Sequence, residues 1–410
     1  MSAAPTPLLL VEDSPVYAEI LQRLLPSLGA DLRFDTKWVE TAERALEELA
    51  ARRYELVLLD YRLPGADGLS VLAEIRKMPK ETQPAVIMLT GMGSESVAVE
   101  AMKAGAMDYL PKDNLDVPSL IRAVSGALDR KRLEEQVARY TRELREKNAQ
   151  MEADLNLARE IQEALLPQKY PSFPAAAPAK ESAWRFYHRY LPHATVGGDF
   201  FDVFALSDTE AGIFICDVMG HGVRAALVTA ILRALEEELS PVARDPGKFL
   251  TEVNRRLQTI LKQTRSPMFS TAFCLVADAR RGVLRGANAG HPVPFHLHRA
   301  TGKVAPLPFT KEQSGPALGV FDDSVYPTVE CPIAANDMVL LFTDGVFEVL
   351  NAAGEEYGSD RLLEATRQRL TLPPPVLFGE LLDEIRAFAG QRELLDDICL
   401  VGVEAVRLGS

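Results

Sequence analysis

Acidic residues end short apolar runs in the N-terminal third of the chain. Glu12 and Asp13 end one run, Asp60 ends a second, Thr90 ends a third, and Lys112 follows a fourth. In a parallel sheet the carboxyl ends of strands form the functional edge, so these side chains are expected to meet. Three carboxylates repel one another unless a hard cation lies among them, and Mg²⁺ prefers oxygen ligands. Lys112 can pair with Asp60 and then with an added phosphoryl group, which the Thr90 hydroxyl can follow.

A second set of acids lies in the C-terminal half, each at a strand end or turn and several next to glycine. The set consists of Asp199, Asp217, Asp344 and the pair Asp396 and Asp397. Because these residues are far apart in sequence, only the fold can bring them together. An all-oxygen set favours Mg²⁺ or Mn²⁺ over zinc. Two such ions can share a hydroxide and hold a phosphoryl group in line for displacement.

The elements that position the first set follow an α/β pattern over about residues 5–124. Short continuous runs of Val, Ile and Leu alternate with amphipathic stretches, expected as helices over 16–28, 68–78, 94–104 and from 116 onward. Such runs between helices predict a parallel sheet with both faces covered.

Residues 171–410 have a different pattern, with alternating runs rich in β-branched and aromatic residues. Helical stretches are expected at 224–238, 246–262, 359–369 and 375–390. Strand clusters with helices in two groups predict an α+β sandwich of two packed sheets flanked by helices.

Between these parts, residues 125–170 form a predicted helical linker that contains no glycine after Gly126 and no proline before Pro167. Heptad position a is apolar throughout, while position d becomes polar at Lys147 and Asp154. The pattern predicts an imperfect two-stranded coiled coil and therefore a homodimer. The alternative is a single exposed helix carrying charge pairs.

Bulk properties indicate a soluble globular protein of two or three domains, with 410 residues, 47% hydrophobic and 25% charged. No apolar run reaches the ~18 residues of a membrane helix, and the first residues lack the basic stretch of an export signal. The four scattered cysteines are interpreted as buried thiols of a reducing cytoplasm. A net charge of −13 argues against a nucleic-acid partner. We therefore expect a cytoplasmic protein with neither a nucleic-acid nor a membrane partner.

The first ~120 residues resemble a response-regulator receiver domain in the motifs VEDSP, LLDYRLPGADG, LTGMGS and DYLPKD. The resemblance implies a doubly wound, five-stranded parallel sheet over residues 1–124 and phosphorylation of Asp60 by an upstream histidine kinase. It also implies a Thr90/Tyr109 switch pair beside Lys112 and a cis peptide before Pro111. The implied Mg²⁺ ligands are Glu12, Asp13, Asp60 and the backbone carbonyl of Arg62.

Most of residues 155–405 resembles the metal-dependent serine/threonine protein phosphatases of the PPM family, in the branch that acts on anti-sigma-factor antagonists. The motifs are AREIQEALLP, VGGDFFD, CDVMGHGV, MFSTAFCLV, NAGHPVP, GPALGV, FTDGVFE and LLDDICLV. The resemblance implies a site with two Mn²⁺ or Mg²⁺ ions. Its implied ligands are Asp199, Asp217 bridging both ions, the Val218 carbonyl, Asp344 and Asp396. Asp396 is favoured over Asp397 because the family's ligand stands before the polar residue that opens the last strand.

Two further residues near these motifs have open roles. His221 is either a general acid for the leaving group or a turn histidine that only packs. Glu348 either binds an extra ion or is a surface acid. His291 is expected to shape a loop, and the other four histidines show no ligand spacing.

Together these features predict a two-component response regulator whose output is a phosphoserine/phosphothreonine protein phosphatase. Asp60 phosphorylation and linker-mediated dimerisation would control it, and an anti-sigma-factor antagonist would be the substrate. The alternative is a catalytically weak phosphatase-like module that sequesters a signalling partner. A cyclase or DNA-binding output has no supporting motif.

Overall fold

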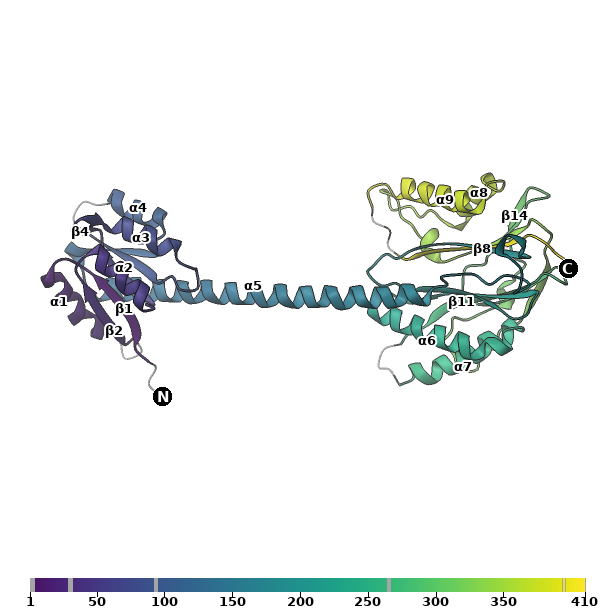
Figure 1. Cartoon of the computed structure of the whole chain (residues 1–410), viewed down its shortest axis with the longest axis horizontal. Coiled ribbons are helices and arrows are strands. Elements are labelled where there is room, and N and C mark those ends of the chain that lie inside the picture. Colours follow the sequence, from purple (N-terminus) through teal and green to yellow (C-terminus); the bar gives the residue numbers. More distant parts are fainter. Residues whose placement is uncertain are drawn as a thin grey trace. The chain divides into compact units, whose positions relative to one another are not determined.

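The computed structural model describes residues 4–28, 32–91, 95–263, 267–392, 394 and 396–409. Residues 92–94, in the LTGMGS motif and at the start of the helix expected over 94–104, lie outside the described residues. The chain divides into two compact units, residues 1–149 and 150–410. Each unit is described by itself below (Figure 1).

The first unit contains the predicted five-stranded parallel sheet, with strand order β2-β1-β3-β6-β7. Its strands are β1 (Thr6–Val11), β2 (Phe34–Val39), β3 (Leu56–Asp60), β6 (Ala85–Thr90) and β7 (Asp108–Pro111). Its helices are α1 (Pro15–Leu24), α2 (Ala42–Ala51), α3 (Gly68–Lys77) and α4 (Glu95–Ala104), with short pieces β4 (Arg62–Leu63), β5 (Ala66–Asp67), η1 (Leu25–Leu28) and η2 (Lys112–Asn114).

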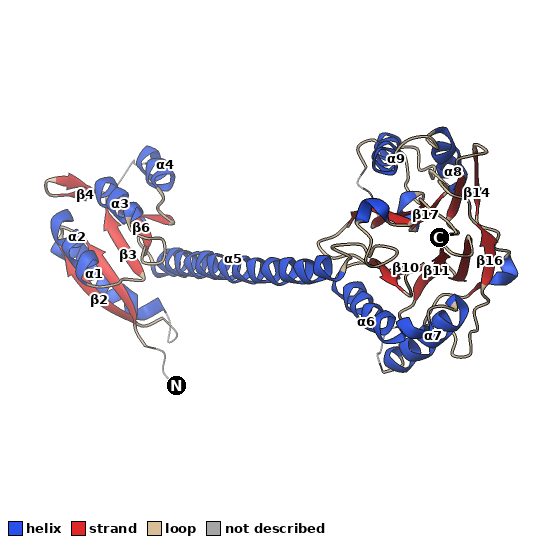
Figure 2. Ribbon diagram, turned by 45° about the vertical axis from the view of Figure 1, so that its right-hand side comes forward, coloured by secondary structure: helices blue, strands red, loops and turns tan. Residues whose placement is uncertain are grey.

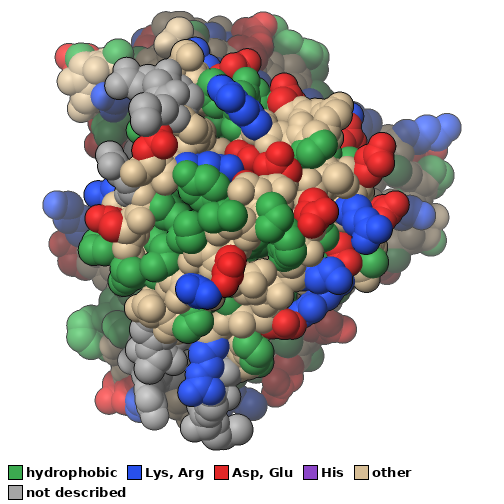
Figure 3. All heavy atoms as spheres, turned by 90° about the vertical axis from the view of Figure 1, so that its left-hand side faces the viewer, with side chains coloured by type: hydrophobic (Ala, Val, Ile, Leu, Met, Phe, Trp, Pro, Cys, Tyr) green, Lys and Arg blue, Asp and Glu red, His purple; other side chains and the backbone are tan. Residues whose placement is uncertain are grey.

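Continuous apolar runs make the central strands, since β3 and β6 are buried along their whole length. Side chains of α1 and the following long helix α5 (Val117–Leu165) pack on one face, and those of α2 and α3 pack on the other. The doubly wound arrangement is therefore confirmed. On the face shown in Figure 3, acidic and basic side chains are interspersed around a group of hydrophobic ones.

Helix α5 is one continuous element of 49 residues that begins inside the first unit. Its first turns bury Leu120, Val124 and Leu128 against the sheet. The Lys131 Nζ, also buried, lies 2.6 Å from Glu55 Oε2. The last helix of the first unit and the predicted linker helix are thus a single helix.

The second unit contains two sheets, one with β15-β12-β11-β10-β9 in order and β16 beside β12, the other β14-β13-β17-β18-β8. The first uses β9 (Asp199–Ala205), β10 (Glu210–Val218), β11 (Ser270–Asp278), β12 (Val283–Ala289), β15 (Ser314–Gly315) and β16 (Val329–Pro332). The second uses β8 (Trp184–Leu191), β13 (Phe295–His298), β14 (Lys303–Pro306), β17 (Met338–Phe342) and β18 (Ile398–Ala405). Its helices are α6 (Val223–Leu239), α7 (Pro246–Leu261), α8 (Ser359–Gln368) and α9 (Pro374–Ala389), with single turns η3 (Ala179–Glu181), η4 (Ser240–Val242), η5 (Lys311–Gln313) and η6 (Asp344–Val346).

The sheets pack face to face, and each outer face is covered by a helix pair (Figure 2). Helices α6 and α7 share the larger core with the first sheet, while α8 and α9 form a separate core with the second. This is the predicted sandwich flanked by helices in two groups.

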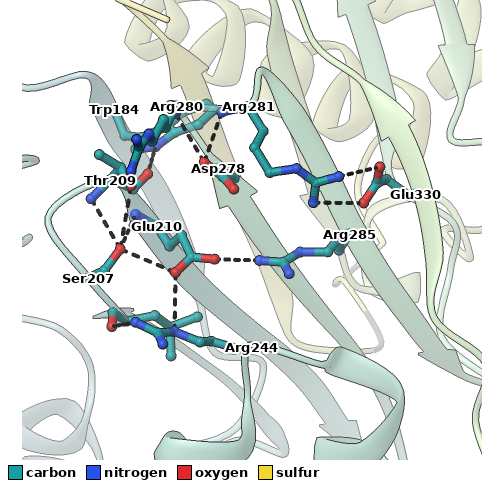
Figure 4. Close-up of polar contacts among 11 residues, drawn as sticks. Trp184, Ser207, Thr209, Glu210, Arg244, Asp278, Arg280, Arg281, Arg285 and Glu330 are labelled. Atoms are coloured by element: carbon teal, nitrogen blue, oxygen red, sulfur yellow. Dashed lines mark hydrogen bonds and ion pairs between the residues drawn. The ribbon is translucent and has the colours of Figure 1, made fainter. Parts of the chain in front are cut away.

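A network of charged side chains lies at one end of the sheet that contains β9 to β12 (Figure 4). Glu210, which begins β10, lies 2.6 Å from Arg285 of β12 and 3.2 Å from Arg244. Arg281 pairs with Glu330 of β16 at 3.1 Å. Because Asp217 is near the other end of β10, this network stabilises the sheet away from the acids expected to do chemistry.

Two further observations bear on the sequence predictions. No helix among the described residues combines the length and apolarity that crossing a membrane requires. The prediction of a cis peptide before Pro111 was wrong: the cis bond in the described chain is Phe173–Pro174. Pro111 is the last residue of β7 and lies opposite Thr90, and a trans bond keeps that strand extended.

Three ionisable side chains, partly or fully buried, connect helix α6 to β9. Arg233 Nη1 lies 3.4 Å from Asp202 Oδ2 and also forms an ion pair with Glu236 Oε2. Burial and then the Asp202 charge raise the pKa of Glu236 to about 8, although Arg233 opposes the rise. The folded protein therefore holds a proton that the unfolded chain releases at a lower pH.

We expect Glu236→Gln to flatten the pH dependence of stability. A raised carboxyl pKa means that the folded state binds more protons than the unfolded state between about pH 4.5 and 8, so stability falls as pH rises through this window. Urea unfolding at pH 5.5 and 8.5 measures the slope. The exposed neighbour Glu237→Gln is the control, and equal slopes in all three proteins would contradict the prediction.

Candidate functional site

The acids of the first unit gather at the carboxyl ends of β1 and β3. Glu12 and Asp13 follow β1, and Asp60 is the last residue of β3. One oxygen of each carboxylate lies within 4.8 Å of the others. Lys112 Nζ donates to Asp60 Oδ2 at 2.8 Å and to Glu12 Oε1 at 2.9 Å. The structure thus brings these four side chains into one site.

The electrostatics of this site suit a divalent cation. Burial raises the pKa of both Glu12 and Asp60, and the hydrogen bond from Lys112 opposes the rise. Burial disfavours the charge of Lys112, but its hydrogen bonds to the two carboxylates outweigh that effect and raise its pKa. With the exposed Asp13 included, three carboxylates face one ammonium, which leaves room for the charge of Mg²⁺.

The other residues predicted for this site lie close to Asp60 in the chain or on strands β6 and β7. Arg62 donates its backbone N–H to Asp60 Oδ1 at 3.3 Å. A Cβ on Gly68 would lie 2.3 Å from the Asp60 carbonyl oxygen, so only glycine permits the close approach of α3. Thr90 ends β6 and is buried, whereas Tyr109 on β7 is 42% exposed. One member of the predicted switch pair therefore faces the interior and the other the surface.

The acids of the second unit meet at one end of the sandwich, two from each sheet. Asp199 and Asp217 are direct cross-strand partners in β9 and β10. Asp344 follows β17, and Asp396 precedes β18, its neighbour in the other sheet. The Thr343 hydroxyl donates to Asp199 Oδ2 at 2.7 Å and links the two sheets at this point. The fold thus brings together four residues that the sequence places far apart.

These carboxyl groups repel one another strongly. Burial raises the pKa of Asp217 to about 8, with the charges of Asp344 and Asp396 adding to the rise. Burial, then Glu348 and Asp396, raise the pKa of Asp344 to about 6. Asp199 is fully buried, and burial raises its pKa well above its usual value. A cation among them would relieve this repulsion.

The donor set fits Mg²⁺ or Mn²⁺ in chemistry, since it consists of carboxylates with the Val218 carbonyl close by. A Cβ on Gly198 would lie 2.7 Å from that carbonyl oxygen, so the glycine loop packs directly against it. Among the described residues, no three of these acids offer oxygens that all lie within 4.8 Å of one another. Their spacing is therefore wider than that of the receiver acids.

Asp396 and Asp397 occupy different environments. Asp397 is buried and accepts hydrogen bonds from the backbone N–H groups of His193 at 2.7 Å, Gly198, and Asp199 at 3.4 Å. Asp396 is exposed and lies near Asp217. Asp397 thus holds the loop that leads into β9, while Asp396 remains available to a ligand.

The C-terminal end of α5 contacts the same loop. The Gln162 side chain is buried, donates to the Gly197 carbonyl at 2.8 Å and accepts from the Gly197 N–H at 2.9 Å. A Cβ on Gly197 would lie 2.2 Å from Asp397 Oδ2, so the loop fits tightly between the helix and that carboxylate. The sequence analysis did not identify Gln162, because nothing in a helical repeat indicates which polar residue is buried.

The histidines near the acids of the second unit differ in burial and in the residues that they contact. His221 is exposed on the turn that follows β10. Burial raises the pKa of Asp396, and His193 and His221 oppose the rise. The sequence analysis missed His193, whose ring centroid lies 6.1 Å from that of His221. His291 is buried, and its backbone exchanges hydrogen bonds with the Asn288 side chain at 2.8 and 2.9 Å, as expected of a residue that shapes a loop. Glu348 is exposed, and its charge contributes to the raised pKa of Asp344.

Comparison with known proteins matches a different family to each unit of the chain. The response regulator receiver domain family matches residues 8–125, and the stage II sporulation protein E (SpoIIE) family matches residues 207–406. The chain joins a receiver domain to a SpoIIE domain. The SpoIIE domain has the fold of the SiaA-PP2C domain of Pseudomonas aeruginosa, with a TM-score of 0.53, 24% identity, and coverage of 63% of this chain and 98% of that one.

Two curated relatives share part of this arrangement. Protein IcfG of Synechocystis sp. is 25% identical over 61% of this chain and 41% of its own length. Phosphoserine phosphatase RsbP of Bacillus subtilis is 28% identical over 48% of this chain and 45% of its own. The chain therefore spans somewhat less than half of either relative.

Proposed function

We propose that the chain is a response regulator whose receiver domain controls a metal-dependent protein phosphatase. The observation that carries the proposal is the convergence of Asp199, Asp217, Asp344 and Asp396 from two sheets into one site whose carboxyl groups repel one another. The likeness to a phosphoserine phosphatase supports a phosphoserine or phosphothreonine substrate. An anti-sigma-factor antagonist protein is the substrate that we propose, and a histidine kinase is the upstream partner.

In this proposal Asp199, Asp217, the Val218 carbonyl, Asp344 and Asp396 hold two Mn²⁺ or Mg²⁺ ions. When bound, the ions supply an activated water and withdraw charge from the phosphoryl group. The protein's own part is to fix the ligands, through Thr343 on Asp199 and through Asp397 on the glycine loop. His221 at the rim is exposed, so it can approach the leaving oxygen of a substrate and donate a proton to it.

We propose that α5 transmits the state of Asp60 to this site. The helix is buried in the receiver at its start and holds Gly197 through Gln162 at its end. A shift or rotation of the helix would therefore displace the loop that precedes Asp199. The contact supports this route because it joins the linker to the backbone of the site itself.

The same helix supports dimerisation. Apolar side chains at its seam positions are 56–63% exposed: Leu133, Val137, Tyr140, Leu144, Met151 and Ile161. Such a stripe on an otherwise charged helix is the pattern of a coiled-coil partner surface. We propose a homodimer that pairs along α5.

Phosphorylation of Asp60 is expected to change phosphate release by about 5–150-fold, the usual range of coupling between two sites. Acetyl phosphate is added as phosphodonor, and release from a phosphorylated antagonist protein is measured in the wild type and in Asp60→Ala. Only the wild type should respond. Asp35→Ala is the control, because Asp35 is an exposed acid on β2 and its loss should leave the response to the donor intact. Solution mass, measured in the same samples, reports dimerisation. Equal rates with and without the donor in the wild type would rule out control by Asp60.

The second candidate function is a module that binds and sequesters a partner without catalysis. Such a module would have no need of a metal site, whereas Asp199, Asp217, Asp344 and Asp396 are all present here. Mn²⁺-dependent cleavage of p-nitrophenyl phosphate distinguishes the two functions. Cleavage by the wild type supports the phosphatase, and its absence at every Mn²⁺ concentration supports the binding module.

A further inference from the structure

Two histidines and an aspartate meet at the edge of the second sheet. His296 and His298 lie two residues apart on β13, so both side chains are on one face. His296 Nε2 is 3.0 Å and His298 Nδ1 is 3.3 Å from the same oxygen, Asp337 Oδ2. The two ring centroids are 3.7 Å apart. One ligand atom from each of the three residues lies within 4.8 Å of the others.

The backbone holds this trio in place. The β13–β17 ladder pairs His296 with Val339 and Leu297 with Met338, which brings His298 beside Asp337. The backbone of Asp337 is hydrogen-bonded to the end of β18, because the Ala405 N–H donates to the Asp337 backbone carbonyl at 2.9 Å. The Ala334 N–H donates to Asp337 Oδ2 at 3.2 Å and fixes the carboxylate. Ligands held in this way require little reorganisation to bind an ion.

The trio is partly enclosed but accessible. His296 and Asp337 are buried, whereas the His298 side chain is 36% exposed. It is also separate from the acid cluster, because Asp337 precedes β17 and Asp344 follows it. Seven residues at about 3.3 Å each place these two aspartates roughly 20 Å apart.

We propose that His296, His298 and Asp337 form a binding site for a borderline divalent cation of the Zn²⁺ class. Two imidazoles and one carboxylate are typical zinc ligands, whereas Mg²⁺ and Mn²⁺ prefer all-oxygen sites. Tetrahedral ligands at about 2.0–2.1 Å from zinc lie about 3.3 Å from one another, close to the 3.0 and 3.3 Å observed here. The fourth position would face solvent on the His298 side.

The sequence alone indicates no ligand spacing for these two histidines. A two-residue spacing on a strand aligns both imidazoles, but the third ligand comes from a distant turn. An ion bound here would join β13 to the turn before β17. We infer a structural role, since the site lies far from the acids at the other end of β17.

The test uses metal-stripped full-length protein in excess Mg²⁺, which occupies the carboxylate sites. Zn²⁺ is titrated in competition with a chelating dye, and Co²⁺ is titrated separately to follow its visible absorption. We expect one Zn²⁺ equivalent and a Co²⁺ band of tetrahedral type. His298→Gln, at a half-exposed position, should weaken Zn²⁺ binding at least ~10-fold, and Asp337→Asn should do the same.

His188→Gln is the matched control, since it removes an imidazole elsewhere in the same sheet and should leave Zn²⁺ affinity unchanged. Zn²⁺ should also raise the melting temperature of the wild type but not that of His298→Gln. Absence of a Zn²⁺ equivalent in excess Mg²⁺, or unchanged affinity in His298→Gln, would overturn the proposal. Because the readouts are metal binding and melting temperature, neither result depends on phosphatase activity.

Discussion

Asp217→Asn should lower phosphatase activity by at least ~10³-fold, measured as Mn²⁺-dependent cleavage of p-nitrophenyl phosphate. Losing a single preorganised electrostatic contact costs about 10²–10³-fold in other enzymes, and Asp217 is the proposed ligand of both ions. The substitution also removes a charge that raises the pKa of Asp199. The metal-free variant should therefore be at least as resistant to unfolding as the wild type.

This combination of lost activity and retained stability separates a functional role from a structural one. Asp383→Asn is the matched control, since that side chain is 79% exposed on α9 and should leave both properties unchanged. An Asp217→Asn protein that keeps more than about a tenth of wild-type activity would contradict the proposed site, because losing one such contact usually costs about 10²–10³-fold.

Gln162→Ala should lower kcat by about 10–100-fold with little change in KM, the usual effect of losing a residue that orients the ligands of a metal site. Its side chain satisfies both backbone groups of Gly197, and the next residues are Gly198 and Asp199. Steady-state kinetics at saturating Mn²⁺ measures the effect. Circular dichroism checks folding, since two buried backbone groups lose their partner.

Gln150→Ala is the control on the same helix, because that side chain is exposed and bonds Asp154 at the surface. Gln162→Glu provides a second variant that still accepts from the Gly197 N–H but cannot donate to its carbonyl. Its kcat should also fall. Wild-type kcat in both Gln162 variants would show that α5 does not act through this contact.

The sequence predicted the elements with strong local patterns. Continuous apolar runs located β1, β3 and β6, which are buried over most or all of their length. The sequence patterns did not predict β2 and α2. β2 is an edge strand whose alternating side chains leave only Val39 fully buried, so it has no continuous apolar run.

The candidate sites were predictable where chemistry follows a strand end, as at Asp60, Asp217 and Asp344. Residues that orient other site residues through hydrogen bonds were not predictable from the sequence. Asp397 is distinguished from its neighbour Asp396 by its burial and its backbone hydrogen bonds. Gln162 is distinguished from the exposed Gln150 by its burial and its bonds to Gly197. Such roles depend on contacts between distant segments, which composition and spacing do not encode.

The unbroken run of α5 from the receiver to Gln162 has a consequence for how such proteins can exchange modules. Each inserted residue turns the remainder of a helix by about 100°, whereas seven residues complete nearly two turns. A foreign sensory domain joined ahead of Gln162 should therefore work only at junctions whose lengths differ by multiples of seven. Helical phase would then decide which recombinants transmit a signal.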